Sequence, residues 1–200
     1  MNGPTLTGRR SPWVVFTAAD DPWLRTETAA LEDAGGLVLR LNGKDLLEPA
    51  LLFQTFAREL NFPSYFGRNW DALVDCLQDW HGPGHGMRDV VVLIEDADAL
   101  LGAEFLGLFV SVLCQAAWIA NLRLDGDGDG DGDGDGDGVR DGSRLPFGLH
   151  FVLLLNHTSP AAFAQAAEAG MDVVVALSDG RLTASLLDAE WPGDPFWNSA

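Results

Sequence analysis

The sequence predicts an α/β protein with a small parallel β-sheet packed with helices. Short runs rich in Val, Leu and Ile alternate with segments of helical apolar spacing along most of the 200 residues. Two of these runs, at residues 90–94 and 151–155, are apolar at every position, which is typical of strands buried on both faces. Alternating strands and helices favour parallel pairing, because each helix carries the chain back over the sheet. These patterns do not give the order of the strands.

Turn and cap residues set the expected boundaries of the elements. Gly35-Gly36 follows the first helix, Pro49 suits the first turn of the second, and Asp179-Gly180 suits a tight hairpin turn. In chain order we expect a strand at 13–16, a helix at 21–34, a strand at 37–41, a helix at 49–60, a helix from about 70, a strand at 90–94, a helix at 103–121, and then strand 151–155, helix 160–169 and strands 173–177 and 182–187.

Composition and charge restrict the classes of partner. An apolar content of 47% in 200 residues is enough for one sizeable core. The net charge is −18 and the chain has a single lysine, so direct binding to nucleic acid is not expected, because phosphate contacts need Lys and Arg. A basic protein is the more suitable partner.

Cysteine usage and the apolar segments favour a cytoplasmic protein. Cys76 and Cys114 are too few for a disulfide framework, and both fall in apolar helical patterns where a reduced, buried thiol is expected. Residues 105–122 carry no charge, but polar residues interrupt them, so a buried core helix is expected and not a membrane span. No apolar signal segment follows Arg9 and Arg10.

One helix carries an unusual acidic strip. Asn69 is a good N-cap, so the helix is expected to begin at Trp70. At 100° per residue, one arc is apolar and the opposite arc is acidic. The apolar arc holds Trp70, Leu73, Cys76, Leu77 and Trp80, and the acidic arc holds Asp71, Asp75, Gln78 and Asp79. The helix dipole accounts for Asp71 in the first turn but not for Asp75, and no Lys or Arg on the helix relieves their repulsion.

The loop and helix together form the stretch Tyr65-Phe66-Gly67-x-Asn69-x-Asp71-Ala72-Leu73-x-Asp75-Cys76-Leu77. At ten of its thirteen positions this stretch resembles the signature of the barstar family. The members of this family are intracellular inhibitors of barnase-type ribonucleases. This match is much more specific than a short degenerate motif. The resemblance implies a barstar-like domain with a three-stranded parallel core at residues 36–157. Residues 1–35 and 158–200 are then an N-terminal βα extension and a C-terminal αββ extension, both expected to extend the sheet of the same domain.

The resemblance also implies a function. Barstar-like inhibitors place an acidic helix and the preceding loop in the active site of a basic ribonuclease, where carboxylates occupy positions meant for RNA phosphates. The positions that match partner contacts of the family are Tyr65, Gly67, Asp71, Val74, Asp75 and Trp80, with Asp75 as the central anchor. No cofactor and no enzyme activity are expected, and the free protein is expected to be monomeric.

Two features depart from the family pattern. Val74, at the edge of the acidic strip, replaces a large aromatic residue, and residues 105–122 offer no carboxylate for the acidic contact that the family makes from its later helix. A different target therefore stays open: an immunity or interaction protein of the same fold could bind another basic toxin or a non-nuclease protein.

Other candidate sites are weaker. Residues 125–138 are seven Asp-Gly pairs, which resemble a calcium loop but lack its final glutamate, so a disordered surface insert is expected. His81 and His85 lie on a Gly/Pro-rich loop without further metal ligands nearby, so no metal site is expected. A small α/β enzyme that uses His150 or His157 near strand ends is a distant alternative.

Overall fold

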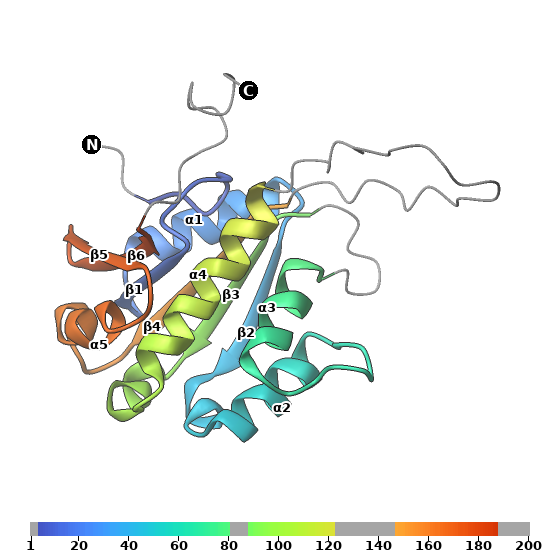
Figure 1. Ribbon diagram of the computed structural model, residues 1–200. Coiled ribbons are helices and arrows are strands. Elements are labelled where there is room, and N and C mark those ends of the chain that lie inside the picture. Colours follow the sequence, from blue (N-terminus) through green and yellow to red (C-terminus); the bar gives the residue numbers. More distant parts are fainter. Residues whose placement is uncertain (1–3, 81–87, 123–146, 188–200) are drawn as a thin grey trace, which may run out of the picture.

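A single six-stranded sheet organises the chain, with the strand order β2-β3-β4-β1-β6-β5. The computed structural model describes residues 4–80, 88–122 and 147–187, so the Asp-Gly insert and both His81 and His85 lie outside the described residues. Helices cover both faces of the sheet (Figure 1). The predicted α/β class is confirmed.

The elements alternate as expected for most of the chain. The strands are β1 (Val14–Ala18), β2 (Leu37–Asn42), β3 (Val90–Glu95), β4 (Leu149–Leu155), β5 (Val173–Ser178) and β6 (Arg181–Leu186). The helices are α1 (Pro22–Asp33), α2 (Pro49–Glu59), α3 (Trp70–Gln78), α4 (Leu106–Leu122) and α5 (Ala164–Glu168), with 3₁₀ turns η1 (Gly43–Leu46), η2 (Ala97–Gly102) and η3 (Pro160–Phe163).

Strand pairing confirms the parallel core and shows how the flanking segments join it. β2, β3 and β4 pair side by side in parallel, as the resemblance implied. β1 adds to β4 in parallel, and the β5–β6 hairpin then adds antiparallel strands next to β1. Both flanking segments therefore extend the same sheet. The division into a main domain and two extensions stays a prediction.

Two helix boundaries differ from those expected. The helix predicted at 103–121 begins at Leu106, because Ala103 has extended backbone angles (φ −78°, ψ 120°) that separate α4 from the 3₁₀ turn η2. The helix predicted at 160–169 divides into η3 and α5, which fits the common use of a 3₁₀ turn at a helix end. The hairpin turn at Asp179-Gly180 is confirmed, with φ angles of 51° and 77°.

The sheet separates two apolar layers. α2, α3 and α4 lie on the face shown in front in Figure 1, and α1 lies behind it. Alternate side chains of β3 serve the two layers: Val92 and Ile94 join the larger core, while Val91 and Leu93 join the smaller core under α1. Among the described helices none is long and apolar enough to cross a membrane, and α4 is a buried core helix as expected.

One ion pair joins the N-terminal segment to the C-terminal hairpin. Asp21 caps α1 and accepts hydrogen bonds from Arg181 Nε (2.5 Å) and Nη2 (2.8 Å) on β6, and from Thr17 Oγ1 (2.6 Å). The Arg181 guanidinium also lies 4.9 Å from the ring centre of Trp23. Both charged side chains are largely buried, at 12% and 13% exposure. The pair therefore fixes α1 against the added strands.

The environment of Asp21 makes this contact sensitive to pH. Burial by itself raises the pKa of Asp21, but hydrogen bonds from Arg181, Thr17 and the Trp23 backbone outweigh it and lower the pKa from 3.8 to about 2. A carboxyl whose pKa is lowered by folding stabilises the protein above its unfolded pKa. That contribution is lost as the pH falls from about 4 to about 2.

We expect Asp21→Asn to lower the free energy of unfolding by about 1–2 kcal/mol at pH 7, a value reduced for solvent screening. Asparagine also caps helices well, so the loss reports the charge. Denaturant unfolding at pH 7, 4 and 2.5 should show the difference from wild type shrinking towards the lowest pH. Asp20→Asn, at the exposed neighbouring residue, is the control and should have little effect. A deficit that is equal at all three pH values would contradict the prediction.

Candidate functional site

The start of α3 is fixed by its cap. Asn69 has extended backbone angles (φ −135°, ψ 174°), and its Oδ1 accepts a hydrogen bond of 2.8 Å from the Ala72 backbone N–H. The predicted N-cap and the predicted first helical residue, Trp70, are both confirmed. The helix therefore begins at a defined residue, and this sets the direction of every side chain that follows.

The inner face of α3 packs on the larger core. Leu73 and Leu77 are fully buried, and Trp70 and Cys76 are half-buried against the same core. The Trp70 ring lies edge-on to Phe53 on α2, with ring centres 4.9 Å apart. α3 also lies along α4, as Figure 1 shows. α3 is thus held in place by its contacts with α2 and α4.

The loop before α3 is held by aromatic packing. Phe66 is 9% exposed and meets the edge of Phe62, with ring centres 5.1 Å apart. The Phe66 backbone N–H donates to the carbonyl of Pro63 at 3.0 Å. Tyr65, next to this anchor, points outward and is 84% exposed. The exposed tyrosine predicted beside the acidic strip is confirmed, and Gly67 is exposed in the same loop.

Asp71 and Asp75 lie exposed on the outer face of α3. Neither forms an ion pair within the described part of the chain. Among the described residues, the side chain of Asp75 accepts one long hydrogen bond, of 3.4 Å, from Gln78 Nε2. Burial, and then the charges of Asp75 and Asp79, raise the pKa of the Cys76 thiol, which shows the negative field at this helix. The two exposed carboxylates form an unpaired acidic surface.

Val74 and Trp80 are not part of that exposed surface. Each is only 8% exposed, and both belong to the larger core. Trp80 Nε1 donates to the Leu60 carbonyl at 2.5 Å and so joins the end of α3 to the end of α2. The expectation that Val74 lies at the edge of the acidic strip is corrected, because the helix turns it towards the core. Partner contact by either residue stays a prediction, with little exposed area for it.

Arg68 is a residue of this surface that the sequence did not single out. It is exposed, it makes no hydrogen bond or ion pair with any residue that the structure describes, and its φ angle is +50°. A left-handed backbone costs a non-glycine residue about 1–2 kcal/mol. Gly67, the neighbour that could adopt this conformation cheaply, does not have a positive φ. The sequence predicts a tight turn before α3, but it does not show which residue of the turn has the left-handed φ angle.

The histidine alternatives do not form a reactive site. His150 is fully buried, and its ring nitrogens lie 3.2 Å and 2.7 Å from the carbonyl oxygens of Pro12 and Gly8. Burial lowers the pKa of His150, although those carbonyls act in the opposite direction. His157 is exposed, and its backbone N–H donates to Asp98. His150 thus holds the N-terminal segment through its contacts with Gly8 and Pro12. The described residues contain no group of three or more His, Cys, Asp or Glu side chains that could hold a metal ion.

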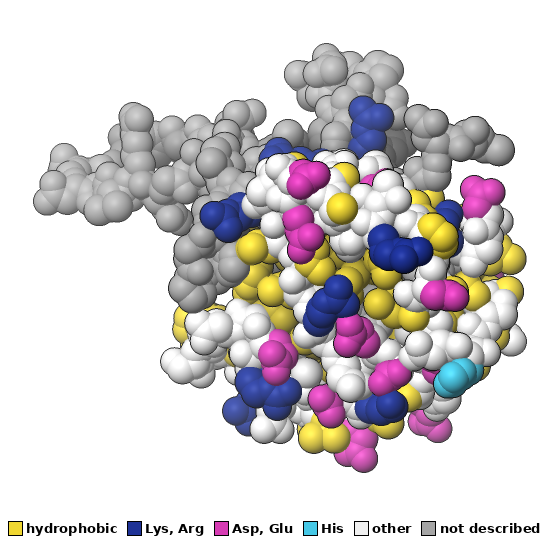
Figure 2. All heavy atoms as spheres, turned by 180° about the vertical axis from the view of Figure 1, so that it is seen from behind, with side chains coloured by type: hydrophobic (Ala, Val, Ile, Leu, Met, Phe, Trp, Pro, Cys, Tyr) yellow, Lys and Arg dark blue, Asp and Glu magenta, His cyan; other side chains and the backbone are white. Residues whose placement is uncertain are grey.

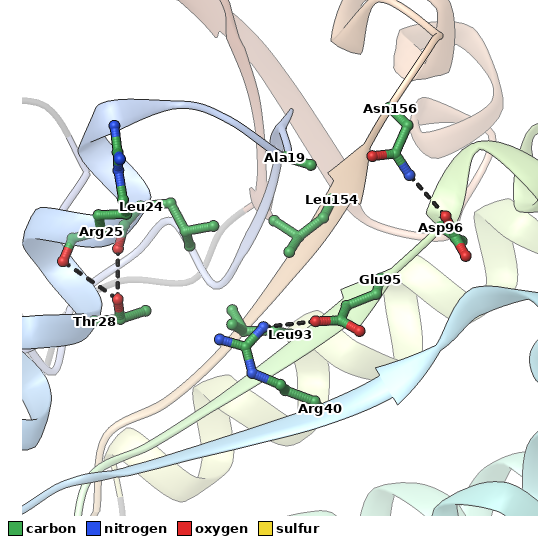
Figure 3. A pocket seen from close by; sticks show the side chains of 10 residues that line it. All are labelled: Ala19, Leu24, Arg25, Thr28, Arg40, Leu93, Glu95, Asp96, Leu154 and Asn156. Carbon is green, nitrogen blue, oxygen red and sulfur yellow. Dashed lines mark hydrogen bonds and ion pairs between the residues drawn. The ribbon is translucent and has the colours of Figure 1, made fainter.

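A hollow lies on the face of the sheet opposite α3. It has a volume of about 370 Å³ and opens at the carboxyl ends of the parallel strands, beside α1 (Figure 3). Figure 2 shows this face, where hydrophobic side chains lie among basic and acidic ones. The residues that line it are Ala19, Leu24, Arg25, Thr28, Arg40, Leu93, Glu95, Asp96, Leu154 and Asn156.

The carboxylates of this hollow are already paired. Glu95 accepts from Arg40 at 2.6 Å, and Asp96 accepts from Lys44 and from Asn156, each at 2.7 Å. Asp98, behind them, accepts from the backbone N–H groups of residues 156–158, and these bonds outweigh its burial and lower its pKa. These groups stabilise the loops after β3 and β4, whereas the acidic surface of α3 has no such partners.

Comparison with known proteins finds a family match across the middle of the chain. Residues 37–122 match the model of a family described as Barstar (barnase inhibitor). A curated relative, the "Putative ribonuclease inhibitor YrdF" of Bacillus subtilis (strain 168), is 42% identical over 40 residues, which are 20% of this chain and 44% of the relative. The chain thus spans less than half of that relative's length. The family match runs from β2 to α4 and includes the loop and α3, so the resemblance is confirmed there.

We expect Asn69→Ala to lower the free energy of unfolding by about 1 kcal/mol, because the Ala72 backbone N–H at the start of α3 loses its capping oxygen. Asn69→Asp, which can accept the same hydrogen bond, should stay close to wild type. Thermal and denaturant unfolding of the three proteins measure this difference. Equal stability of the alanine variant and wild type would show that the cap does not fix the helix.

Proposed function

We propose that this protein is an inhibitor of a barnase-type ribonuclease, because residues 37–122 match the barstar family model. The inhibitor binds with the outer face of α3 and the loop before it, and it has no catalytic role of its own. The description of the matched family as an inhibitor supports this proposal. The name of the curated relative, which also refers to ribonuclease inhibition, supports it over a shorter stretch.

One observation carries the proposal: two exposed carboxylates without cationic partners stand one turn apart on a rigid helix. Like charges at this spacing destabilise an isolated helix by roughly 0.2–0.5 kcal/mol. The free protein gains no ion pair from Asp71 or Asp75 within its described residues. Their arrangement suits a partner that supplies cations.

The active site of a ribonuclease supplies such cations, because it binds a polyanion. In the proposed complex, Arg, Lys or His side chains of the ribonuclease donate charge-assisted hydrogen bonds to Asp71 and Asp75. The helix is already ordered by its cap and its core contacts, so little conformational entropy is lost on binding. RNA is excluded because its phosphates need the same cations.

Tyr65 and the net charge of the protein should also contribute to binding, the first by direct contact and the second by long-range electrostatic attraction. Tyr65 presents an exposed aromatic ring beside the acidic surface, and such rings are frequent in binding hot spots. The net charge of −18 accelerates encounter with a basic protein, and this effect weakens as salt screens the charges. The association rate should therefore depend strongly on salt.

Two features favour a target range different from that of other family members. Val74 is buried and adds little to the surface, and α4 carries no carboxylate. Binding to another basic toxin would use the same α3 surface. Retained binding to such a protein, without inhibition of any barnase-type ribonuclease, would favour this second candidate.

We expect Asp75→Asn and Asp75→Ala to weaken inhibition by about 2–5 kcal/mol, the range typical when a buried charge pair at an interface loses one partner. The free energy of unfolding should change by no more than roughly 0.5 kcal/mol. Asp71→Ala should act alike on inhibition, with a slight loss of stability at the helix N-terminus. Inhibition titrations with barnase and related basic ribonucleases, run beside melting curves, measure both effects.

Asp33→Asn is the matched control for these variants. It removes the same charge from an exposed position at the end of α1, so the net charge of the protein is equal in both cases. Its inhibition should stay near that of wild type. If the Asp75 variants inhibit as well as Asp33→Asn does, the acidic surface of α3 is not the recognition element.

We also expect Tyr65→Ala to weaken inhibition while leaving the melting temperature nearly unchanged, because the ring is 84% exposed. Tyr65→Phe keeps the ring and should retain most of the inhibition if stacking dominates. A strongly destabilised alanine variant would instead show that Tyr65 supports the loop.

A further inference from the structure

Arg68 combines two unfavourable features in the free protein. Its backbone is left-handed, with φ +50°, although it has a full side chain. It also directly precedes the N-cap Asn69, and a cation at a helix N-terminus is repelled by the positive end of the helix dipole. Glycine at this position would avoid both costs.

No contact of the free protein compensates for these costs. Arg68 is exposed and makes no hydrogen bond, ion pair or ring contact with the described residues, whereas Arg58 on α2 pairs with Glu59. The loop itself is held by Phe66 and by the Asn69 cap, neither of which uses the Arg68 side chain. The left-handed turn is therefore held by the loop, and within the described residues the Arg68 side chain makes no contact that stabilises it.

The position of Arg68 places a cation within the proposed binding surface. It is exposed, and it lies in the loop before α3, between Tyr65 and Asp71 in the sequence. Because the loop backbone is fixed at both ends, the side chain starts from a defined point. A ribonuclease that docks on Asp71 and Asp75 therefore meets one positive charge beside two negative ones.

We propose that Arg68 is a specificity-determining residue that pairs with a carboxylate of the ribonuclease, at the rim of the basic cleft that Asp71 and Asp75 enter. This inference rests on the proposed function. A cleft that is basic throughout would place its own cations against Arg68, so the arginine selects against such ribonucleases. The favoured partner has a basic active site with an acidic side chain next to it.

The test compares Arg68→Gly with wild type, using barnase and other basic ribonucleases and taking forward those that the wild type inhibits. The variant should melt a few degrees higher, because glycine accepts the left-handed angle, and should inhibit at least tenfold less strongly. Loss of one positive charge makes the protein more acidic, so net charge alone would strengthen inhibition. Weaker inhibition by a more stable, more acidic variant therefore reports a specific contact.

Two controls separate the backbone from the charge. Asn61→Gly relieves the other left-handed residue of this loop (φ 51°) and should leave inhibition unchanged. Arg58→Gln removes one positive charge from α2 and should not weaken inhibition. Arg68→Lys should recover part of the loss, and inhibition by Arg68→Glu should be restored when the facing carboxylate of the ribonuclease is replaced by lysine.

The outcomes distinguish this inference from the proposal on which it rests. Normal or stronger inhibition by Arg68→Gly, together with weak inhibition by Asp75→Asn, would overturn the role of Arg68 and leave the inhibitor function intact. Absence of inhibition of every ribonuclease by the wild type would overturn both.

Discussion

The burial of α4 is the constraint on which the rest of the structure depends. Phe109, Val110 and Leu113 are fully buried, and the helix lies on the front face of the sheet with α3 beside it. β3 and β4 supply the apolar floor on which it rests, and each is buried along nearly its whole length. α3 can expose its carboxylates only because its opposite face closes this core. The proposed recognition is thus a consequence of packing, because the core fixes α3 and α3 fixes the direction of Asp71 and Asp75.

Two acidic regions among the described residues show how the same residue types serve different purposes. At the carboxyl ends of β3 and β4, Asp96 and Asp98 accept several hydrogen bonds each and stabilise the loops. On α3, Asp71 and Asp75 accept almost none. An unpaired carboxylate retains its full capacity for a cation from another molecule, whereas a paired one must first give up a partner. The difference in pairing, more than the number of charges, separates a structural site from a binding site.

Local residue patterns predicted the parts of this site that depend on local physics. The Asn69 cap and the buried Leu73 and Leu77 follow from capping preference and helical spacing, and both agree with the structure. The strand order could not be predicted, because the crossover from β1 to β2 passes over two strands that come later in the chain. The burial of Val74 could not be predicted from helical spacing, because it depends on which side chains of the larger core pack against that side of α3. The positive φ of Arg68 depends on the closure of a loop whose ends are fixed by distant contacts.

The added strands β1, β5 and β6 leave the acidic surface of α3 accessible. β1, β6 and β5 all join the sheet on the side of β4, so the opposite edge, at β2, remains the end of the sheet next to α2 and α3. Strands added beyond β2 would instead lie close to the helices that present the acidic surface. The Asp21–Arg181 pair fixes the added strands through α1, on the other face of the sheet. The chain can therefore gain core and stability from its flanking segments without covering the residues through which we propose it binds.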